Sequence, residues 1–357
     1  MELGTASAAP GELARGSFEV TSLPTGTPET LPVIIANGEE DGPTLWITGG
    51  VHGDEATGVA VAQDTMRESL PEEISGAVVC VPVVNPAGLR RNARHSYYGD
   101  DDPNRKFPDP ESDSSRPPEL QERIDERLYD AIVDSADALV DCHTAGVHSS
   151  PFVIRDRVLY GERRTEEEAQ ELAEELEALV EACGLPLLTE YPAEEYVEQG
   201  LQRSTAGAVC NAAGIPAFTT ELGTHSVVTE DIREAGVAGN YGVMDELGML
   251  DEWPEEVAEP GAFEAPVDFP VRRYNGPRTE TAGLVRHRVE AGDVVEEGEV
   301  VADIVTANGE QLDTVEAEHD GYVIGRTEGL AVYEGDSVLR MAARDDGDLL
   351  APRNPDE

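Results

Sequence analysis

Lysine is almost missing from this chain of 357 residues, since Lys106 is the only one. Arginine therefore carries nearly all of the positive charge against 74 Asp and Glu side chains, and the formal net charge is −49. Without a basic patch to neutralise phosphates, no nucleic-acid partner is expected. The carboxylates are spread along the whole chain, which favours a solvated surface screened by the salt of a halophile's cytoplasm over an acidic face for a basic partner.

Long apolar runs are also absent. No stretch approaches the roughly 18 residues that a bilayer-spanning helix needs, so we expect no membrane span. The first twenty residues lack a basic start followed by an apolar block, so we expect no signal peptide and, by default, a cytoplasmic location. Cysteines are few and form no Cys-x-x-Cys pair, so they are interpreted as buried reduced thiols. They are Cys80, Cys142, Cys183 and Cys210.

Short apolar runs alternate with amphipathic stretches between residues 43 and 223, which predicts an α/β domain with a parallel or mixed sheet. Strands are predicted at 45–51, 77–84, 138–142 and 216–222. Helices are predicted at 55–68, 118–135, 165–183, 204–213 and 229–247. Residues 90–118 are rich in Arg, Asp, Pro and Ser without periodicity, so we expect a long loop of the kind that often carries function.

Composition changes after Trp253, so we assign residues 1–252 to the α/β domain and 253–272 to a linker. Residues 273–345 are predicted to form a small all-β domain. Its GDVV, GEVVADI, DGYV and EGDSVL pieces resemble the barrel-sandwich domains of the biotinyl and lipoyl type. Those carriers attach their cofactor to a lysine, which is absent here, so a structural or substrate-shielding role remains. Residues 346–357 are predicted to be a disordered tail.

The segment ITGGVHGDEATG places His52 and Glu55 where a predicted strand ends and a helix begins. Two ligands three residues apart across such a turn can converge on one metal ion, and the glycines let the backbone approach closely. Open α/β sheets build their sites at the carboxyl ends of strands. That placement favours a metal site over a surface histidine beside a helix-start carboxylate.

A second histidine, His143, ends the predicted strand ALVDC. Strand alternation puts Asp141 and His143 on one face and Cys142 on the other, in the core. Asp141 is then predicted to fix the tautomer of a ligating His143. Two His and one Glu leave a coordination position open, the pattern of a catalytic zinc, so we predict one Zn²⁺ per chain. The ligand types also allow cobalt or manganese.

Glu221 ends the predicted strand of PAFTTELG. A carboxylate within reach of a zinc-bound water would take its proton and later deliver it to the leaving nitrogen, so Glu221 is the predicted general base. The alternative is a strand-end glutamate that caps the following turn.

The long loop carries RRNAR and NRK in a chain that otherwise avoids positive charge. Guanidinium groups bind carboxylates bidentately, so the loop is interpreted as a receptor for an anionic substrate. The alternative is a set of surface ion pairs, which we prefer for Arg90 and Arg91.

Five motifs in order resemble the succinylglutamate desuccinylase/aspartoacylase branch of the zinc carboxypeptidase-like hydrolases. They are GGVHGDE, NPAG with Arg94 nine residues after Asn85, PNRKFP, DCHT and TELG, and they span residues 46–223. The resemblance implies a three-layer α/β domain with a mixed sheet. One departure is Asp102-Pro103 before Asn104, where the family usually has Asp-Leu.

The resemblance also implies roles for individual residues. It makes His52, Glu55 and His143 the zinc ligands and Glu221 the general base. Asn104 and Arg105 resemble the pair that grips the substrate carboxylate, and Arg94 resembles the arginine that polarises the scissile carbonyl. Arg203, in GLQRSTAG, is assigned as a further substrate-binding arginine.

These roles predict hydrolysis of a succinyl, acetyl or similar group from an N-acylated amino acid or related small carboxylate. One alternative is a metallocarboxypeptidase acting on peptides, since the scaffold and zinc ligands are shared. The other is a non-catalytic carboxylate-binding protein, against which Glu221 argues. The acyl group, the amine and the oligomeric state, a homo-oligomer included, are left open.

Overall fold

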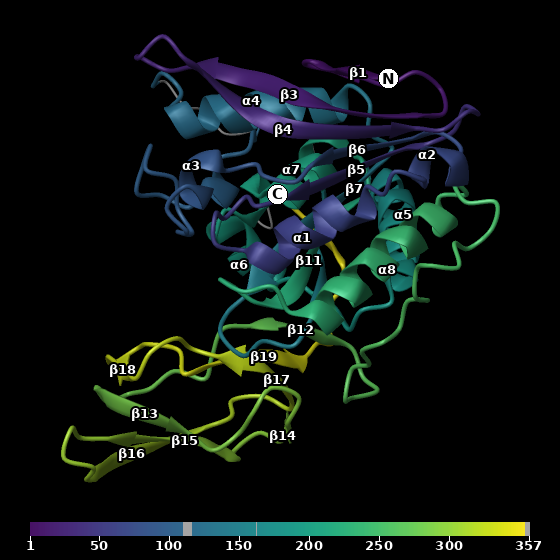
Figure 1. Cartoon of the computed structure of the whole chain (residues 1–357). Helices are drawn as coiled ribbons and strands as arrows, with labels where there is room; N and C mark the ends of the chain where they lie inside the picture. The colour runs from purple at the N-terminus through teal and green to yellow at the C-terminus, as the bar shows by residue number, and fades with distance from the viewer. Residues whose placement is uncertain (110–115, 162, 354–357) are drawn as a thin grey trace.

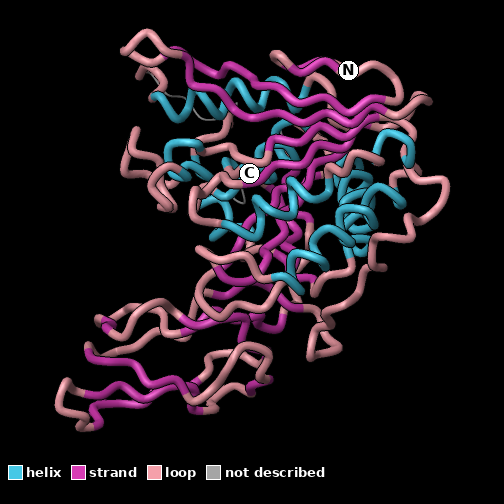
Figure 2. Tube along the Cα trace, viewed as in Figure 1, coloured by secondary structure: helices cyan, strands magenta, loops and turns pink. Residues whose placement is uncertain are grey.

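A twelve-stranded mixed sheet organises the molecule. The structure, a computed structural model, describes residues 1–109, 116–161 and 163–353. The strand order in the sheet is β14-β17-β19-β12-β10-β8-β11-β7-β5-β6-β4-β3. It continues from the α/β part into the C-terminal part, as the magenta strands of Figure 2 show.

The four predicted strands form the middle of this sheet. They are β5 (Thr44–Gly49), β6 (Ala77–Val81), β7 (Ala138–Ala145) and β11 (Ala217–Thr224). β7 lies between β5 and β11 and is parallel to both, and β6 is parallel to β5. Their carboxyl ends therefore meet at one edge. Cys142 is buried in the core as a free thiol, which confirms the predicted alternation.

Helices cover both faces of the sheet, which gives the predicted three layers (Figure 1). One face carries α1 (Ala56–Thr65), α5 (Glu166–Cys183) and α8 (Glu230–Glu246), and the other carries α4 (Leu120–Val133) and α7 (Thr205–Ala208) with its π-helical extension Val209–Ala213. Their apolar residues at helical spacing pack on the strands while the acidic residues face solvent. Among the described helices, none combines the length and hydropathy needed to cross a bilayer.

An N-terminal hairpin completes one edge of the sheet. β3 (Glu12–Ser22) pairs with β4 (Pro28–Asn37), and β4 joins β6 antiparallel. A small separate hairpin of β1 (Glu2–Leu3) and β2 (Ala6–Ser7) precedes them. No strand was expected here from the sequence, because the alternating pattern was recognised only from residue 43 onward.

On the other side of β11 the sheet leads into the C-terminal part. β8 (Phe152–Arg155) is antiparallel to β11, and β10 (Leu187–Thr189) and β12 (Val271–Tyr274) follow in parallel. β19 (Leu339–Arg344), β17 (Gly321–Arg326) and β14 (Val294–Val295) then extend the sheet antiparallel. β12 starts inside the predicted linker 253–272.

The C-terminal part is all β, as predicted. Besides the strands that extend the main sheet, it holds a second sheet of order β16-β15-β13-β18. Its members are β13 (Gly283–His287), β15 (Val300–Val305), β16 (Gln311–Glu316) and β18 (Ala331–Val332). A separate apolar cluster that includes Val285, Ile304 and Val323 contains residues of both sheets. Two sheets with one core fit the barrel-sandwich resemblance.

The predicted disordered tail is wrong for the part that the structure describes. Leu350–Pro352 forms β20, which pairs in parallel with β9 (Val158–Tyr160). Residues 354–357 lie outside the described residues. The segment has no local periodicity, and its strand exists only because β9, far away in sequence, offers unpaired backbone groups.

Arg157 fastens this C-terminal segment to the α/β domain. Its side chain is 3% exposed. It donates to the Asp348 carbonyl at 2.7 Å and to the Asp345 carboxylate at 3.1 Å. It also donates to the backbone carbonyls of Tyr191 at 2.9 Å and Glu190 at 3.0 Å.

We expect Arg157→Met to destabilise the protein by about 3–5 kcal/mol, because it leaves a buried carboxylate and three carbonyls without their donor. The shift of the denaturation midpoint measures the loss. Arg286→Met, at an exposed arginine of β13, is the matched control and should stay within about 0.5 kcal/mol of wild type. Equal stability of the two variants would mean that the tail is not fastened in this way.

Candidate active site

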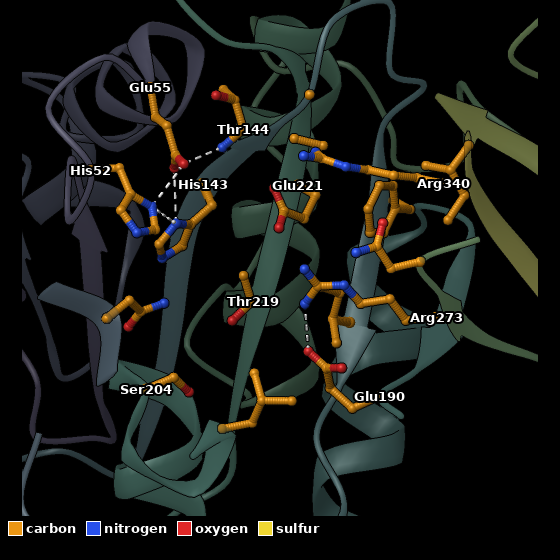
Figure 3. A pocket seen from close by; sticks show the side chains of 18 of the residues that line it. His52, Glu55, His143, Thr144, Glu190, Ser204, Thr219, Glu221, Arg273 and Arg340 are labelled. Carbon is orange, nitrogen blue, oxygen red and sulfur yellow. Dashed lines mark hydrogen bonds and ion pairs between the residues drawn. The ribbon is translucent and has the colours of Figure 1, made fainter. Parts of the chain in front are cut away.

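Three buried side chains converge at the carboxyl edge of the sheet. His52 follows β5, Glu55 immediately precedes α1, and His143 lies in β7. Glu55 bridges the two rings, with Oε1 2.7 Å from His52 Nδ1 and Oε2 2.8 Å from His143 Nδ1. The two Nδ1 atoms are 3.2 Å apart. Figure 3 shows the rings and the carboxylate turned toward one another, and the three ligand atoms fall within 4.8 Å.

Glycines allow the backbone segments around the cluster to approach so closely. A Cβ added at Gly58 in α1 would lie 2.5 Å from the Cys142 carbonyl oxygen of β7. One added at Gly53 would lie 2.1 Å from the carbonyl carbon of Gly88. Any side chain at either position would push the helix or the loop away, so these glycines set the distance between the ligands.

Carboxylates on the outer side of each ring turn both Nδ1 atoms inward. Asp141 Oδ2 lies 2.7 Å from His143 Nε2, and its other oxygen accepts the Thr48 hydroxyl at 2.7 Å. Asp141 therefore stands where the sequence predicted a tautomer-fixing partner. Ligating imidazoles usually have such partners, which orient the ring and raise its basicity.

The partner of His52 is Asp102, which sequence reasoning treated only as a departure from the family pattern. Its Oδ1 lies 2.9 Å from His52 Nε2 and also accepts the Asn104 amide at 2.9 Å. This second bond caps the short helix Pro103–Arg105. The Asp-Pro-Asn sequence signals such a turn, but it does not reveal which histidine the carboxylate meets.

The charges of the cluster fit a cation. Burial alone would raise the pKa of Glu55, yet the neighbouring imidazoles His52 and His143 hold it well below its ordinary value. Burial alone would lower the pKa of His143, yet Asp141 and Glu55 raise it well above its ordinary value. A divalent metal at this position would supply the positive charge that the carboxylate favours, and two imidazoles with one carboxylate suit zinc.

Glu221 stands beside the cluster because of strand register. In the parallel pair β11–β7 it lies opposite His143, so both side chains point to the same face. Its Oε2 is buried and has no hydrogen-bond partner among the described residues. Burial raises the pKa of Glu221, and the charge of Glu55 adds to the rise.

A cavity of about 380 Å³ opens in front of these residues. Four predicted residues besides the three ligands line it, namely Glu221, Arg94, Asn104 and Arg105. Arg94 donates to Glu55 at 3.1 Å and to Asp102 at 2.9 Å. A guanidinium at this distance from a candidate ligand is placed to meet negative charge that develops next to the metal.

Asn104 and Arg105 are fixed by backbone and side-chain contacts. The Asn104 side-chain oxygen accepts the amide and the hydroxyl of Thr205 at 2.8 and 3.0 Å. Arg105 donates to the carbonyls of Asn104 at 2.6 Å and Gln199 at 3.2 Å. Their remaining donors are available to the cavity they line.

The structure does not bring Arg203 into this cavity, which corrects its assignment as a substrate-binding residue. Its Nε donates to the Phe107 carbonyl at 3.1 Å, and a second guanidinium nitrogen lies 3.5 Å from Glu122. Arg203 therefore ties the long loop to α4. The motif GLQRSTAG could not show this, because the direction of the side chain depends on where residue 107 lies.

Two arginines from the C-terminal part line the cavity and were missed. Arg273 of β12 donates to Glu190 at 2.8 Å. Arg340 of β19 reaches the cavity wall next to Gly146, where an added Cβ would lie 2.6 Å from its Nη1. Within the described residues no hydrogen bond or ion pair is found for Arg340. Figure 3 shows both guanidinium groups pointing toward Glu221. Only their place in a scarcely basic chain could have singled them out.

Several known proteins are similar to this chain in sequence and in fold. Residues 41–247 match the succinylglutamate desuccinylase/aspartoacylase catalytic domain. An N-alpha-acetyl-L-2,4-diaminobutyric acid deacetylase from Halomonas elongata is 26% identical over 87% of this chain and 85% of its own length.

Among solved structures, a succinylglutamate desuccinylase/aspartoacylase from Rhodobacter sphaeroides matches with a TM-score of 0.71 and 23% identity, over 94% of this chain and 95% of the other. The product-bound ectoine utilization protein EutE (DoeB) from Ruegeria pomeroyi matches with a TM-score of 0.73 and 19% identity, over 96% and 100%. At such identities these structures show a common fold, which includes the C-terminal all-β part.

The matched domain covers more than half of the chain and contains the whole candidate ligand cluster and Glu221. This chain belongs to the succinylglutamate desuccinylase/aspartoacylase family.

Proposed function

We propose that this protein is a zinc-dependent hydrolase that removes an acyl group from the amine of a small N-acylated amino acid. The observation that carries the proposal is the position of Glu221. It lies in register with His143, lines the cavity, and has one buried side-chain oxygen without a hydrogen-bond partner among the described residues. A purely structural strand-end glutamate would be expected to use that oxygen in a cap.

His52, Glu55 and His143 would hold the zinc ion and leave a coordination position open. When bound there, zinc polarises the scissile carbonyl and lowers the pKa of the attacking water. Asp141 and Asp102 keep the two rings in the tautomer that presents Nδ1 to the ion.

Other residues of the cavity would transfer the proton, stabilise the developing negative charge and bind the substrate. Glu221 accepts the proton of the attacking water and returns it to the leaving nitrogen. Arg94 donates to the oxygen on which negative charge develops. Asn104 and Arg105 hold the substrate carboxylate, which fixes the amide in front of Glu221. An amine and a carboxylate are the products.

Two further points support a small acylated substrate. The Halomonas elongata relative is by name a deacetylase of an N-acetyl amino acid. In this chain, Arg273 and Arg340 from the C-terminal strands line the cavity, whose volume of about 380 Å³ lies at the lower end of the range for small-molecule sites. The acidic composition further leads us to propose a salt-rich cytoplasm as the working environment.

A substrate panel in high salt tests the proposal directly. Zinc-loaded protein is offered N-acetyl and N-succinyl amino acids on one side and peptides with free C-termini on the other, and the released amine is measured. Turnover of the acylated amino acids supports the proposal. Turnover of peptides alone would make the protein a metallocarboxypeptidase, and binding without turnover would make it a binding protein.

We expect one equivalent of zinc per chain in wild type. His143→Ala should lose nearly all bound zinc, since the two remaining protein ligands are too few to hold the ion. Metal content after dialysis measures this. His225→Ala is the matched control, because His225 also lines the cavity but contacts Ser226 and Glu328 instead of the cluster. Equal zinc content in His143→Ala and wild type would refute the ligand assignment.

We expect Glu221→Gln to lower kcat about 10²- to 10⁴-fold, the usual contribution of a general base, while zinc content stays unchanged. Steady-state kinetics on the best substrate of the panel gives the ratio. Glu175→Gln, on the exposed face of α5, removes one carboxylate far from the site and should keep wild-type kcat. A Glu221→Gln enzyme with full activity would remove the residue from the mechanism.

A further inference from the structure

One wall of the cavity is built by β8, and an acid, Asp156, directly follows this strand. Phe152 and Ile154 line the cavity, since alternate residues of an extended strand share a face, and Asp156 lines it as well. Arg155 points to the other side, where it meets Glu177 of α5 at 2.6 Å. Along this wall, the apolar side chains of Phe152 and Ile154 lie between Glu221 and the carboxyl group of Asp156.

Strand register shows where this wall of the cavity lies relative to Glu221. Phe152 lies opposite Glu221 in the antiparallel pair β8–β11, and Ile154 lies opposite Thr219. Asp156 follows two residues after Ile154, just beyond the end of β8. The cavity lining therefore extends from the level of Glu221 past Ile154 to a carboxyl group.

The Asp156 carboxyl group is held from one side only. Its side chain is 3% exposed. Oδ1 accepts the hydroxyl of Tyr196, in α6 (Ala193–Glu198), at 2.7 Å, and that hydroxyl accepts from Asn211 at 3.1 Å. For Oδ2 no hydrogen bond is found among the described residues. Because Asp156 lines the cavity, a ligand bound there can supply the missing donor.

The two nearby arginines, Arg273 and Arg105, make their hydrogen bonds to other groups and not to Oδ2 of Asp156. Arg273 is engaged with Glu190 at 2.8 Å, and Arg105 donates to two backbone carbonyls. Burial, with the charge of Glu190, raises the pKa of Asp156 to about 8. Among the described residues no ion pair is found for Asp156, and a carboxyl group buried in this way gains most from a ligand that brings a positive charge.

We propose that Asp156 binds a terminal ammonium group of the substrate, so that the enzyme acts on N-acylated diamino acids. The inference rests on the proposed function and narrows its substrate class. Arg105 lies close enough to influence Asp156 and is assigned to the substrate carboxylate. Two charged contacts would then bind the leaving amino acid, its carboxylate at Arg105 and its ammonium group at Asp156. Its methylene groups would pack against Ile154.

The choice of an ammonium over a neutral donor follows from charge. An ammonium group offers three N–H donors in a compact shape and forms a charge-assisted hydrogen bond with a single carboxylate oxygen. A neutral alkyl chain of the same length would leave Oδ2 without a donor. We expect a preference of about 10- to 100-fold in kcat/KM for the charged substrate, the usual effect of one such bond.

The test compares charged and neutral substrates of equal length on the zinc enzyme. The pairs are N-acetyl-2,4-diaminobutyrate with N-acetylnorvaline, and N-acetylornithine with N-acetylnorleucine. Wild type should prefer the charged member of at least one pair. Asp156→Asn should remove that preference by raising KM for the charged substrate far more than KM for the neutral one. Asparagine keeps an oxygen for the Tyr196 hydroxyl, so the fold is retained.

Tyr196→Phe is the control for a structural role. It removes the hydrogen bond that holds Asp156 but keeps the carboxyl group, so most of the charge preference should survive. The inference is overturned if wild type does not distinguish the pairs, or if Asp156→Asn slows both members equally, as a purely structural residue would.

A binding measurement separates this inference from the proposed function. Calorimetry with free 2,4-diaminobutyrate and ornithine needs no turnover. If no acylated substrate is hydrolysed but these amines bind wild type and not Asp156→Asn, the proposed function fails and the ammonium site stands. If acylated amino acids are hydrolysed without regard to charge, the function stands and the ammonium site fails.

Discussion

The parallel pairing of β7 with β5 on one side and β11 on the other is the constraint on which the site depends. Register places Thr48 opposite Asp141 and Glu221 opposite His143. One strand step in either pair would turn the partner to the opposite face of the sheet, because side chains alternate. That Asp141, His143 and Glu221 share one face of the sheet is therefore a direct result of hydrogen bonds between backbones.

That arrangement buries several charges, and they differ in how they are balanced. Glu55 is balanced by two imidazoles, and Asp141 by a hydroxyl and an imidazole. Glu221 and Asp156 line the cavity, and for one oxygen of each no donor is found among the described residues. Uncompensated buried carboxyl groups cost stability. They occur here at the two positions where we assign a reacting proton and a substrate cation.

The C-terminal part is integral to the site. Its strands β12 and β19 continue the central sheet, and Arg273 and Arg340 reach the cavity from them. The sequence excluded a swinging-arm role for it because no lysine is present. The structure adds what the part supplies, which is positive charge opposite Glu221 in a protein that has little positive charge elsewhere.

The sequence by itself determined the four central strands and the helices that cover them, and it predicted a ligand cluster with Glu221 beside it. Those features depend on local spacing: His52 and Glu55 are three residues apart, and Asp141 and His143 alternate along one strand. Tertiary structure decided the rest. Asp102 meets His52, Arg203 turns away to Phe107, and residues 350–352 form a strand on β9. Each of these contacts joins segments about 50 or more residues apart, and no local pattern encodes such a pairing.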